Sequence, residues 1–330
     1  MFCKNILNNK VTVEGLLTIL SIIIVLYFGI IYILFKRKKG LRGNNLRING
    51  ITYLFDKGNE KKIRVKSINT KVIPFIIFKT GIHNYNELDN RLINLFNNYI
   101  YNNPGLRVEY YSDIGSRNFI KNNYNSEVLW AYDMLIPGAY KADLFRYCIL
   151  YKRGGIYSDL SQIFRVPLDN IIDFKNDHLV LVKDTPQYVL RNKHLINENT
   201  TQGVQISFIA SRPNNPIFMD AINKIISNCK ERYMGFNPLS PTGPELFYQV
   251  LKSYDGPYRM DLHLNLGKAG HLFEDGPRII DKNGLVVIIN KSDFHNDLFN
   301  DKQNIPLIKP NRRRHYSELW KSNIVYRSLD

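Results

Sequence analysis

The sequence is poor in cysteine and in acidic residues. Its 330 residues include 3 cysteines, Cys3, Cys148 and Cys229, an odd set without the spacing of a metal site. Such thiols speak against a disulfide framework and against a zinc-built domain. Asp and Glu number 29 against 45 Lys and Arg, a formal net charge of +16 at pH 7. This excess favours polyanionic partners such as nucleic acid, anionic lipid or phosphorylated substrates.

Motifs that would direct this charge to nucleic acid are missing, since the sequence has no recognition helix, zinc motif or RNA-binding motif. The basic runs at residues 36–39 and 312–314 still leave one alternative open, a membrane-tethered module that binds nucleic acid or lipid. No internal repeat is present. A hydrophobic content of 44%, with 21 Tyr and 18 Phe, speaks against a disordered chain and predicts a folded domain.

One hydrophobic run is long. Residues 15–35, GLLTILSIIIVLYFGIIYILF, carry no charge, and a helix of about 20 residues crosses a bilayer core of about 30 Å. The run ends at a basic cluster, residues 36–39, and not at a small-residue cleavage site, which favours a transmembrane helix over a signal peptide. Residues 1–14 are then a short tail and residues 36–70 a basic stem, with a short hairpin around Asn49-Gly50.

From Val72 onward, short apolar runs alternate with helical patterns. The runs VIPFIIF, LRVEYYS, IYSDL, HLVLVKD, QISFIA and GLVVIIN are typical of strands. Leucines at helical spacing after residue 88 predict a helix that stops at Asn103-Pro104-Gly105, and two more helices are expected at residues 126–135 and 139–151. This alternation predicts an α/β sheet with helices on both faces, in one domain over residues 71–330.

The most informative stretch is YKADLFRYCILYKRGGIYSDLSQ, residues 140–162. Asp143 and Arg146 are three residues apart and therefore neighbours on a helix, where an acid and a base can act as one unit. Gly154 and Gly155 end the helix, and the next strand leads to Asp159 at the edge where α/β sheets gather ligands. The same spacing also fits an ordinary helix ion pair followed by a turn acid, and spacing alone does not separate these interpretations.

The segment PGAYKADLFRYCILYKRGGIYSDL resembles the signature of glycosyltransferase family 32, the DXD sugar-binding glycosyltransferases. That family includes fungal α-mannosyltransferases, inositol phosphoceramide mannosyltransferases and α-1,4-galactosyltransferases. Four other segments are similar to family segments: IPFIIFKTG, FIASRPNNPI, PTGP and HYSELW. The resemblance implies a GT-A fold, a Rossmann-like mixed sheet with helices on both faces, behind the N-terminal transmembrane helix.

The resemblance also implies roles for individual residues. Asp143 and Arg146 would hold sugar and ribose hydroxyls of a nucleotide-sugar donor and, with Asp159, form the catalytic set. The rest of the implied donor site is Thr80, Gly81, Gly154, Gly155 and Tyr157. The acceptor side would contain Thr242, Gly243 and Pro244, together with Asp184 at the end of a predicted strand. Because Asp143 and Arg146 are expected to point at ligand, alanine at either position should abolish transfer without unfolding the protein.

Ser161 departs from the family pattern, which has an aspartate at this position. The implied metal set is Asp159, Ser161 and His315, for Mn²⁺ or Mg²⁺, and a hydroxyl is a poorer ligand for hard cations than a carboxylate. Three explanations stay open. The metal binds through Asp159, water and a C-terminal group such as His315; or Lys and Arg neutralise the diphosphate, with reduced metal dependence; or the domain binds a nucleotide sugar without turning it over.

The sequence therefore predicts a single-pass membrane glycosyltransferase that moves a hexose from a UDP- or GDP-sugar to a glycan or lipid-linked acceptor, with retention of configuration. No nucleic-acid partner is expected. The basic cluster after the span places the domain in the cytosol by the positive-inside rule, whereas the resemblance favours a Golgi or ER lumen. Glycosylation at the sequons of Asn199 or Asn290 would report a lumenal domain. Abundant Asn, Ile and Lys suit an AT-rich genome such as that of a large virus.

Overall fold

The structure is a computed structural model, and it describes residues 44–48, 51–55, 71–184, 203–265, 277–290 and 315–328. The predicted transmembrane segment, residues 15–35, and the sequon of Asn199 lie outside these ranges. None of the helices in the described ranges has the length and apolar character needed to cross a bilayer.

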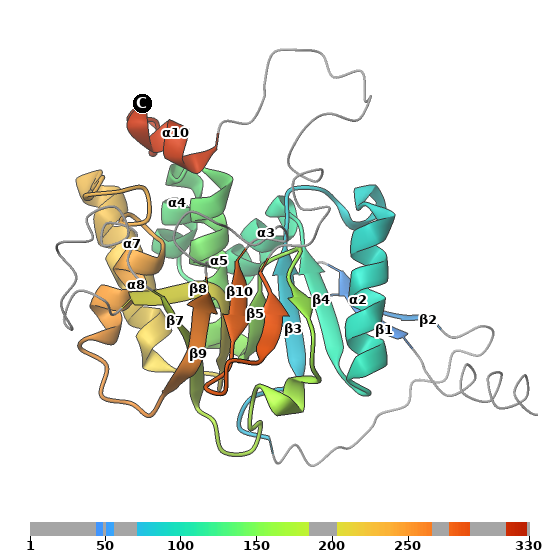
Figure 1. The fold of residues 1–330 in the computed structure, drawn as a ribbon. Coiled ribbons are helices and arrows are strands. Elements are labelled where there is room, and N and C mark those ends of the chain that lie inside the picture. The colour runs from blue at the N-terminus through green and yellow to red at the C-terminus, as the bar shows by residue number, and fades with distance from the viewer. Residues whose placement is uncertain are drawn as a thin grey trace, which may run out of the picture. The chain divides into compact units, whose positions relative to one another are not determined.

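A single 11-stranded mixed sheet runs through the described residues, in the order β2-β1-β4-β3-β5-β8-β7-β9-β10-β11-β6 (Figure 1). Neighbouring strands are parallel from β1 to β5, and the direction reverses where β5 meets β8. The strands are β1 Asn44–Ile48, β2 Ile51–Phe55, β3 Ile76–Thr80, β4 Arg107–Tyr111, β5 Gly155–Ser158, β6 Ile163–Phe164, β7 Leu179–Asp184, β8 Gly203–Ser211, β9 Arg259–Asn265, β10 Arg278–Ile280 and β11 Val286–Ile289.

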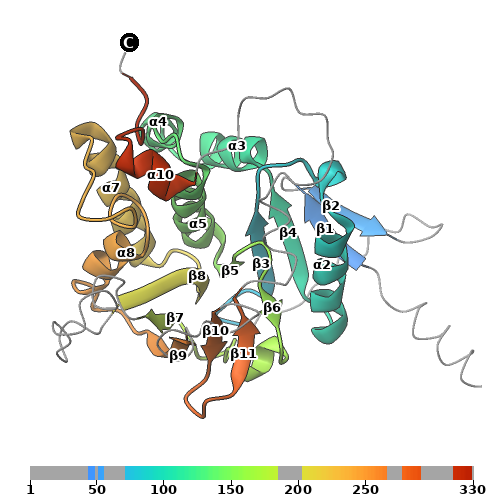
Figure 2. The same ribbon diagram turned by 45° about the horizontal axis from the view of Figure 1, so that its top comes forward.

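Helices cover both faces of the sheet, as the sequence predicts. Figures 1 and 2 show α2 on one flank of β3 and β4, and α5, α7 and α8 on the other side of the fold. The helices are α2 Asn90–Asn102, α3 Asp113–Asn123, α4 Ser126–Met134, α5 Gly138–Arg153, α7 Pro216–Glu231, α8 Pro244–Leu251 and α10 Tyr316–Lys321, with 3-10 turns η1 Tyr85–Glu87 and η2 Leu168–Asn170.

The core divides along the alternation of strand side chains. On β3, Ile76 and Phe78 face the cluster formed with α3, α4, α5, α7 and α8. Ile77, between them, faces the other cluster, to which α2 contributes five buried side chains: Leu92, Leu95, Phe96, Tyr99 and Ile100. Each strand in the middle of the sheet is therefore buried on both faces, which explains why it reads as a continuous apolar run.

The sheet curls back on itself at β6. This short strand follows β5 closely in the chain, yet it pairs with β11 at the far end of the strand order. Phe164 of β6 contacts Tyr99 of α2 and Phe208 of β8, with ring centroids 4.9 and 6.0 Å apart. The turn that joins β5 to β6 therefore lies where the β6 end of the sheet approaches its middle strands.

β1 and β2 lie within residues 36–70, the predicted stem, and flank Asn49 and Gly50, where the sequence predicts a hairpin. β1 pairs in parallel with β4, and Leu46 lies opposite Val108. The sheet therefore extends into the part of the chain that the sequence predicts as a stem.

Candidate active site

The candidate site is built where α5 ends and β5 begins. Gly154 terminates α5 with φ +58°, and Gly155 follows with φ +99°. Residues other than glycine rarely adopt such positive φ values. A Cβ on Gly154 would lie 2.5 Å from the backbone nitrogen of Pro213, and one on Gly155 would lie 2.5 Å from Ile76. Both glycines are thus required to bring α5 and β5 against β3 and the end of β8, as their position in the sequence predicts.

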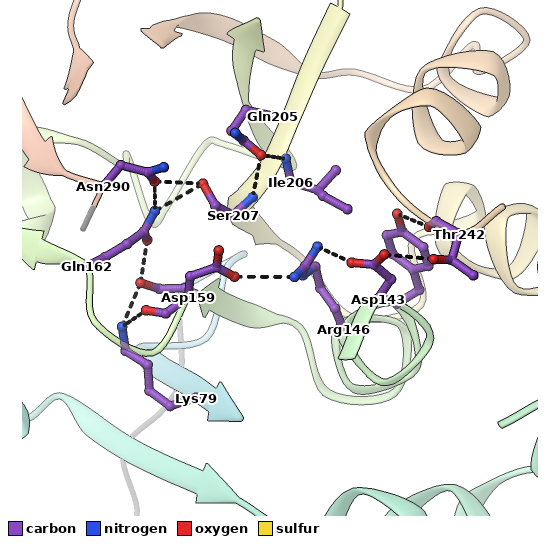
Figure 3. A network of polar contacts seen from close by, with 12 residues as sticks. Lys79, Asp143, Arg146, Asp159, Gln162, Gln205, Ile206, Ser207, Thr242 and Asn290 are labelled. Carbon is purple, nitrogen blue, oxygen red and sulfur yellow. Dashed lines mark hydrogen bonds and ion pairs between the residues drawn. The ribbon is translucent and has the colours of Figure 1, made fainter. Parts of the chain in front are cut away.

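Asp143, Arg146 and Asp159 form one connected chain of charges (Figure 3). Arg146 donates from one guanidinium nitrogen to Asp143 at 2.9 Å and from the other to Asp159 at 3.3 Å. The side chains of Asp143 and Arg146 are 12% and 6% exposed, whereas that of Asp159 is 46% exposed. The structure therefore brings the predicted catalytic set together, and Asp159 is its solvent-facing member.

Tyr157 and the PTGP loop complete the surroundings of this ion pair. The guanidinium of Arg146 stacks on the ring of Tyr157, 4.2 Å from its centroid. Thr242 donates its hydroxyl to the second oxygen of Asp143 at 2.8 Å. Gly243 is packed so closely that a Cβ would lie 3.0 Å from the carbonyl of Leu239, and Pro244 opens α8. The predicted donor and acceptor sides thus meet at Asp143.

Burial sets the electrostatics of Asp143. Desolvation raises the pKa of its carboxyl to about 6, against the opposing effects of Arg146 and the Thr242 hydrogen bond. The Nε atom of Arg146 is buried without a hydrogen-bond partner among the described residues. A buried, unsatisfied N–H is costly, and it is the type of group that a bound polar ligand or water satisfies.

These contacts change one expectation from the sequence. Asp143 and Arg146 are paired with each other and buried, so they do not simply point at ligand. Alanine at either position would also strip a buried charged group of its partner, which is destabilising. The prediction that alanine variants keep the fold intact is therefore replaced by a prediction of lower stability.

Lys79 is a buried cation of the site that the sequence prediction missed. Its ammonium donates to the hydroxyl of Ser158 and to the main-chain oxygen of Asp159, both at 2.7 Å. The side chain is fully buried, and burial lowers the pKa of Lys79 to about 7, with Asp159 acting in the opposite direction. The signal in the sequence was a lysine placed inside the apolar strand IIFKT.

A buried polar network continues from Ser158, and it too was missed. Ser158 donates to Gln162 at 2.6 Å, and Gln162 donates to Asn290 at 2.6 Å and to Ser207 at 3.1 Å. Ser207 also donates to Asn290 at 2.9 Å. The network joins the turn after β5 to β8 and to the end of β11. It occupies the side-chain oxygen of Asn290, so this sequon residue is part of the folded structure.

Thr80 and Gly81, predicted to line the nucleotide pocket, lie at the end of β3. The Thr80 hydroxyl donates to the carbonyl of Tyr111 at 3.1 Å. Gly81 donates its N–H to the same carbonyl at 3.1 Å, and a Cβ there would lie 2.7 Å from the hydroxyl of Tyr110. Both residues therefore hold the ends of β3 and β4 together, next to the turn of Asp159.

The predicted metal ligands are arranged unequally. Ser161 is 2% exposed, in the turn after Asp159. His315 is exposed and caps α10, where its Nδ1 accepts from the N–H of Ser317 at 3.4 Å. In the described part of the chain, no three His, Cys, Asp or Glu side chains are grouped to hold a metal. Asp159 alone fits a cation held mainly by substrate phosphates and water, because Mg²⁺ commonly takes only one or two protein carboxylates.

Asp184 lies farther along the same edge of the sheet. It is the last residue of β7, opposite Gly203 of β8. Gly203 precedes Ser207 by four residues, which places it roughly 13 Å along the strand from the network. The predicted acceptor-side acid is therefore at the edge but away from the Asp143 centre.

The chain is similar to one protein family and to two known proteins. Residues 89–178 match the family described as "Glycosyltransferase sugar-binding region containing DXD motif". An uncharacterized glycosyltransferase of Acanthamoeba polyphaga mimivirus is 32% identical over 183 residues, which are 56% of this chain and 66% of that protein, just under two thirds of its length. The solved PaToxG glycosyltransferase is 15% identical, with a TM-score of 0.37, over 55% of this chain and 69% of that one.

The structural likeness is too low to bear on the fold, which rests on the chain's own strands and helices. The family match spans α2 to η2 and includes Asp143, Arg146 and Asp159. The resemblance seen in the sequence is therefore confirmed: residues 89–178 of this chain match the sugar-binding region of the DXD-containing glycosyltransferases, and the mimivirus relative is itself described as a glycosyltransferase.

Proposed function

We propose that this chain is a glycosyltransferase that moves a hexose from a UDP- or GDP-sugar to a glycan or lipid-linked acceptor, with retention of configuration. The observation that carries the proposal is the buried ion pair of Asp143 and Arg146. Arg146 also binds the half-exposed carboxylate of Asp159. A guanidinium and carboxylates held in fixed directions suit the recognition of several sugar hydroxyls. Packing alone gives no reason to concentrate these charges at one turn.

The proposed reaction requires a site that stabilises developing negative charge. A leaving nucleoside diphosphate gains negative charge as its bond to the sugar breaks, and preorganised cations stabilise that charge. Arg146 is fixed by Asp143, Asp159 and the ring of Tyr157, so it needs no reorganisation when the charge develops.

Asp159 is the residue that would hold a divalent cation in this proposal. The cation, when bound, supplies Lewis-acid stabilisation of the diphosphate. Among the described residues, four charged side chains are joined at this site: Asp143, Asp159, Lys79 and Arg146. Their charges balance when all are ionised, and Ser161 adds none. This balance supports the expectation of reduced metal dependence, because these four described side chains leave no excess negative charge for a cation to neutralise.

A donor screen tests the proposal. The full chain is incubated with UDP- and GDP-sugars, with Mn²⁺, Mg²⁺ or chelator, and release of UDP or GDP is measured. Turnover of at least one donor, lost in Asp143→Asn, supports the proposal. Donor binding without turnover or hydrolysis would instead indicate a pseudoenzyme that binds nucleotide sugars. Binding of a short duplex with a steep salt dependence, and no affinity for nucleotide sugars, would favour the basic binding module.

We also propose that residues 15–35 anchor the enzyme as a transmembrane helix and that the domain faces the cytosol, with a lumenal domain as the alternative. Both proposals rest on the apolar run and the basic cluster at residues 36–39. Expression in a eukaryotic host tests the topology, because glycosylation at Asn199 requires a lumenal domain. Asn290 is a poor reporter, since its side chain is bound to Gln162 and Ser207.

A further inference from the structure

Asp159 is held from two sides by two different cations. Arg146 reaches its carboxylate from α5, at 3.3 Å. Lys79 reaches its main-chain oxygen from β3, at 2.7 Å. Figure 3 shows the two cationic side chains on either side of Asp159. The side chain and the backbone of this residue are therefore fixed independently.

The ammonium group of Lys79 has a hydrogen-bond acceptor for each of its donors. An ammonium has three donors. The acceptors around Lys79 are Ser158 and Asp159, both at 2.7 Å, and the Tyr99 hydroxyl at 3.4 Å. The rings of Tyr99 and Phe164 lie 4.9 and 5.7 Å from the ammonium. The side chain is fully buried between these acceptors and the two aromatic rings.

Packing does not explain such a lysine. Removing an ammonium from water is costly, and a hydrophobic side chain of similar volume usually serves a core at least as well. What a hydrophobic residue lacks is a hydrogen bond to the turn that carries Asp159. The hydrogen bonds of Lys79 to that turn are therefore what distinguishes it from a hydrophobic residue at the same position.

Lys79 acts on both ends of the turn. It binds the carbonyl of Asp159, which also accepts the N–H of Gln162 at 3.2 Å. Through the hydroxyl of Ser158 it orients the side chain of Gln162, whose amide is in turn bound to Asn290 and Ser207. The amide of Asp159 is bound to the carbonyl of Ser207 at 2.8 Å.

We propose that Lys79 is a positioning residue that fixes the turn from Ser158 to Gln162 and so sets the direction of the Asp159 carboxylate toward the donor diphosphate. This inference rests on the proposed transferase function for its catalytic consequence only. Loss of Lys79 leaves the Asp143–Arg146 pair in place, because that pair is held from α5 and by Thr242. The loss of Lys79 does remove the hydrogen bonds that hold the turn, and the orientation of Asp159 changes as a result.

Hydrogen exchange of the full-length protein tests the positioning without any ligand. The variants are Lys79→Met, which removes the donors, and Lys79→Gln, which keeps an uncharged donor. Lys71→Met is the matched control, because Lys71 precedes the same strand but lies over the rings of Phe75 and Phe174. We expect the amides of Asp159 and Gln162 to exchange at least about tenfold faster in Lys79→Met, with partial recovery in Lys79→Gln and no change in Lys71→Met.

Kinetics with a donor found in the screen test the consequence. A misplaced catalytic group costs up to about a hundredfold in rate. We expect kcat to fall between about tenfold and a hundredfold in Lys79→Met, while the donor KM changes by less than about threefold, since the contacts of Arg146 remain. Lys79→Gln should recover part of kcat, and Lys71→Met should keep both parameters. A general loss of stability would not produce this split between kcat and KM.

The two readouts separate the two hypotheses. Unchanged exchange at Asp159 and Gln162 in folded Lys79→Met overturns the positioning role, whether or not the chain transfers sugar. An unchanged kcat in an active protein overturns it as well. Absence of turnover by the wild type refutes only the transferase proposal, and the exchange result then decides the role of Lys79. If Lys79→Met does not fold, Lys79→Gln provides the same comparison.

Discussion

Asp143 and Thr242 are joined by a 2.8 Å hydrogen bond although 99 residues separate them in the chain. The bond connects α5, which carries the Asp143–Arg146 pair, to the loop that opens α8. Because the acceptor is a buried carboxylate with a raised pKa, the hydroxyl of Thr242 does more than close a loop. It stabilises the ionised form of Asp143, the form that pairs with Arg146.

The pKa of Asp143 predicts the acid limit of activity. Burial raises this pKa to about 6, although Arg146 and Thr242 oppose the shift and Asp159 adds to it. As the pH falls through 6, Asp143 gains a proton and loses its charge toward Arg146. We therefore expect donor turnover to decline below about pH 6, with the decline following one proton. A pH–rate profile measures it, and Asp143→Asn should lack this step in any residual activity.

Thr242→Val should move this acid limit upward. The Thr242 hydrogen bond lowers the pKa of Asp143, so its loss raises that pKa further. We expect turnover near pH 6.5 to fall several-fold and turnover at pH 8 to be nearly retained. Ser240→Ala is the control, because Ser240 lies in the same loop but binds the N–H of Asn237. Equal acid limits in wild type and Thr242→Val would show that the bond does not influence Asp143.

Arg146→Ala should destabilise the fold more than Asp143→Asn. Alanine at 146 leaves Asp143 buried without its cation, and breaking a buried pair from one side costs about 3–5 kcal/mol. Asparagine at 143 keeps the shape and can still bond to Thr242, while Arg146 keeps Asp159, so we expect a loss of about 1–2 kcal/mol. Denaturant unfolding of both variants gives the order. The reverse order would show that the buried carboxylate of Asp143 does not depend on Arg146 for its stabilisation.

The sequence predicted the part of the site whose geometry is local. Asp143 and Arg146 meet because a helix brings residues three apart together, and Gly154 and Gly155 mark the end of that helix. The strands in the middle of the sheet were predicted for a similar reason, since burial on both faces leaves a continuous apolar run. The role of Thr242 came from the family resemblance, and spacing alone did not connect it with Asp143.

The missed part of the site depends on topology. Lys79, Gln162, Ser207 and Asn290 come from four strands or strand ends, and only the order of strands in the sheet brings them together. No pattern in any one segment specifies this. Helices α3, α7, α8 and α10 were also missed, although α7 and α8 carry recognisable start signals. Pro216 and Pro244 stand in the first turns of α7 and α8, where proline is favoured.

Gly155→Ala should be far more destabilising than Gly105→Ala. Both glycines have positive φ, +99° and +88°, so both substitutions incur backbone strain of roughly 1–2 kcal/mol. A Cβ at Gly105 meets nothing within 4 Å, whereas one at Gly155 would overlap Ile76 at 2.5 Å. We expect Gly155→Ala to cost at least about 2 kcal/mol more in denaturant unfolding, because β3 and β5 must separate. Equal losses would mean that the close approach of these strands is not required.

Ser161→Asp tests whether the altered motif belongs to a working site. Ser161 is 2% exposed in the turn after Asp159, so an aspartate there adds negative charge in a place with little water. With Mn²⁺ or Mg²⁺ present, the new carboxylate offers a second charged oxygen, and we expect turnover to be kept or increased. With chelator, the same charge faces the donor diphosphate, and we expect donor affinity to fall several-fold below that of the wild type.

The comparison of Ser161→Asp with Ser161→Asn separates charge from shape. Asparagine has nearly the same volume but is neutral, so it should not create metal dependence. If the wild type is a live enzyme whose own cations balance Asp143 and Asp159, its turnover should resist chelator, and only Ser161→Asp should become strictly metal-dependent. Donor affinity and turnover are measured with Mn²⁺, Mg²⁺ and chelator for all three proteins. A wild type that already needs the metal as strictly as Ser161→Asp would refute the balanced-charge interpretation, because Lys79 and Arg146 would then not suffice for the diphosphate.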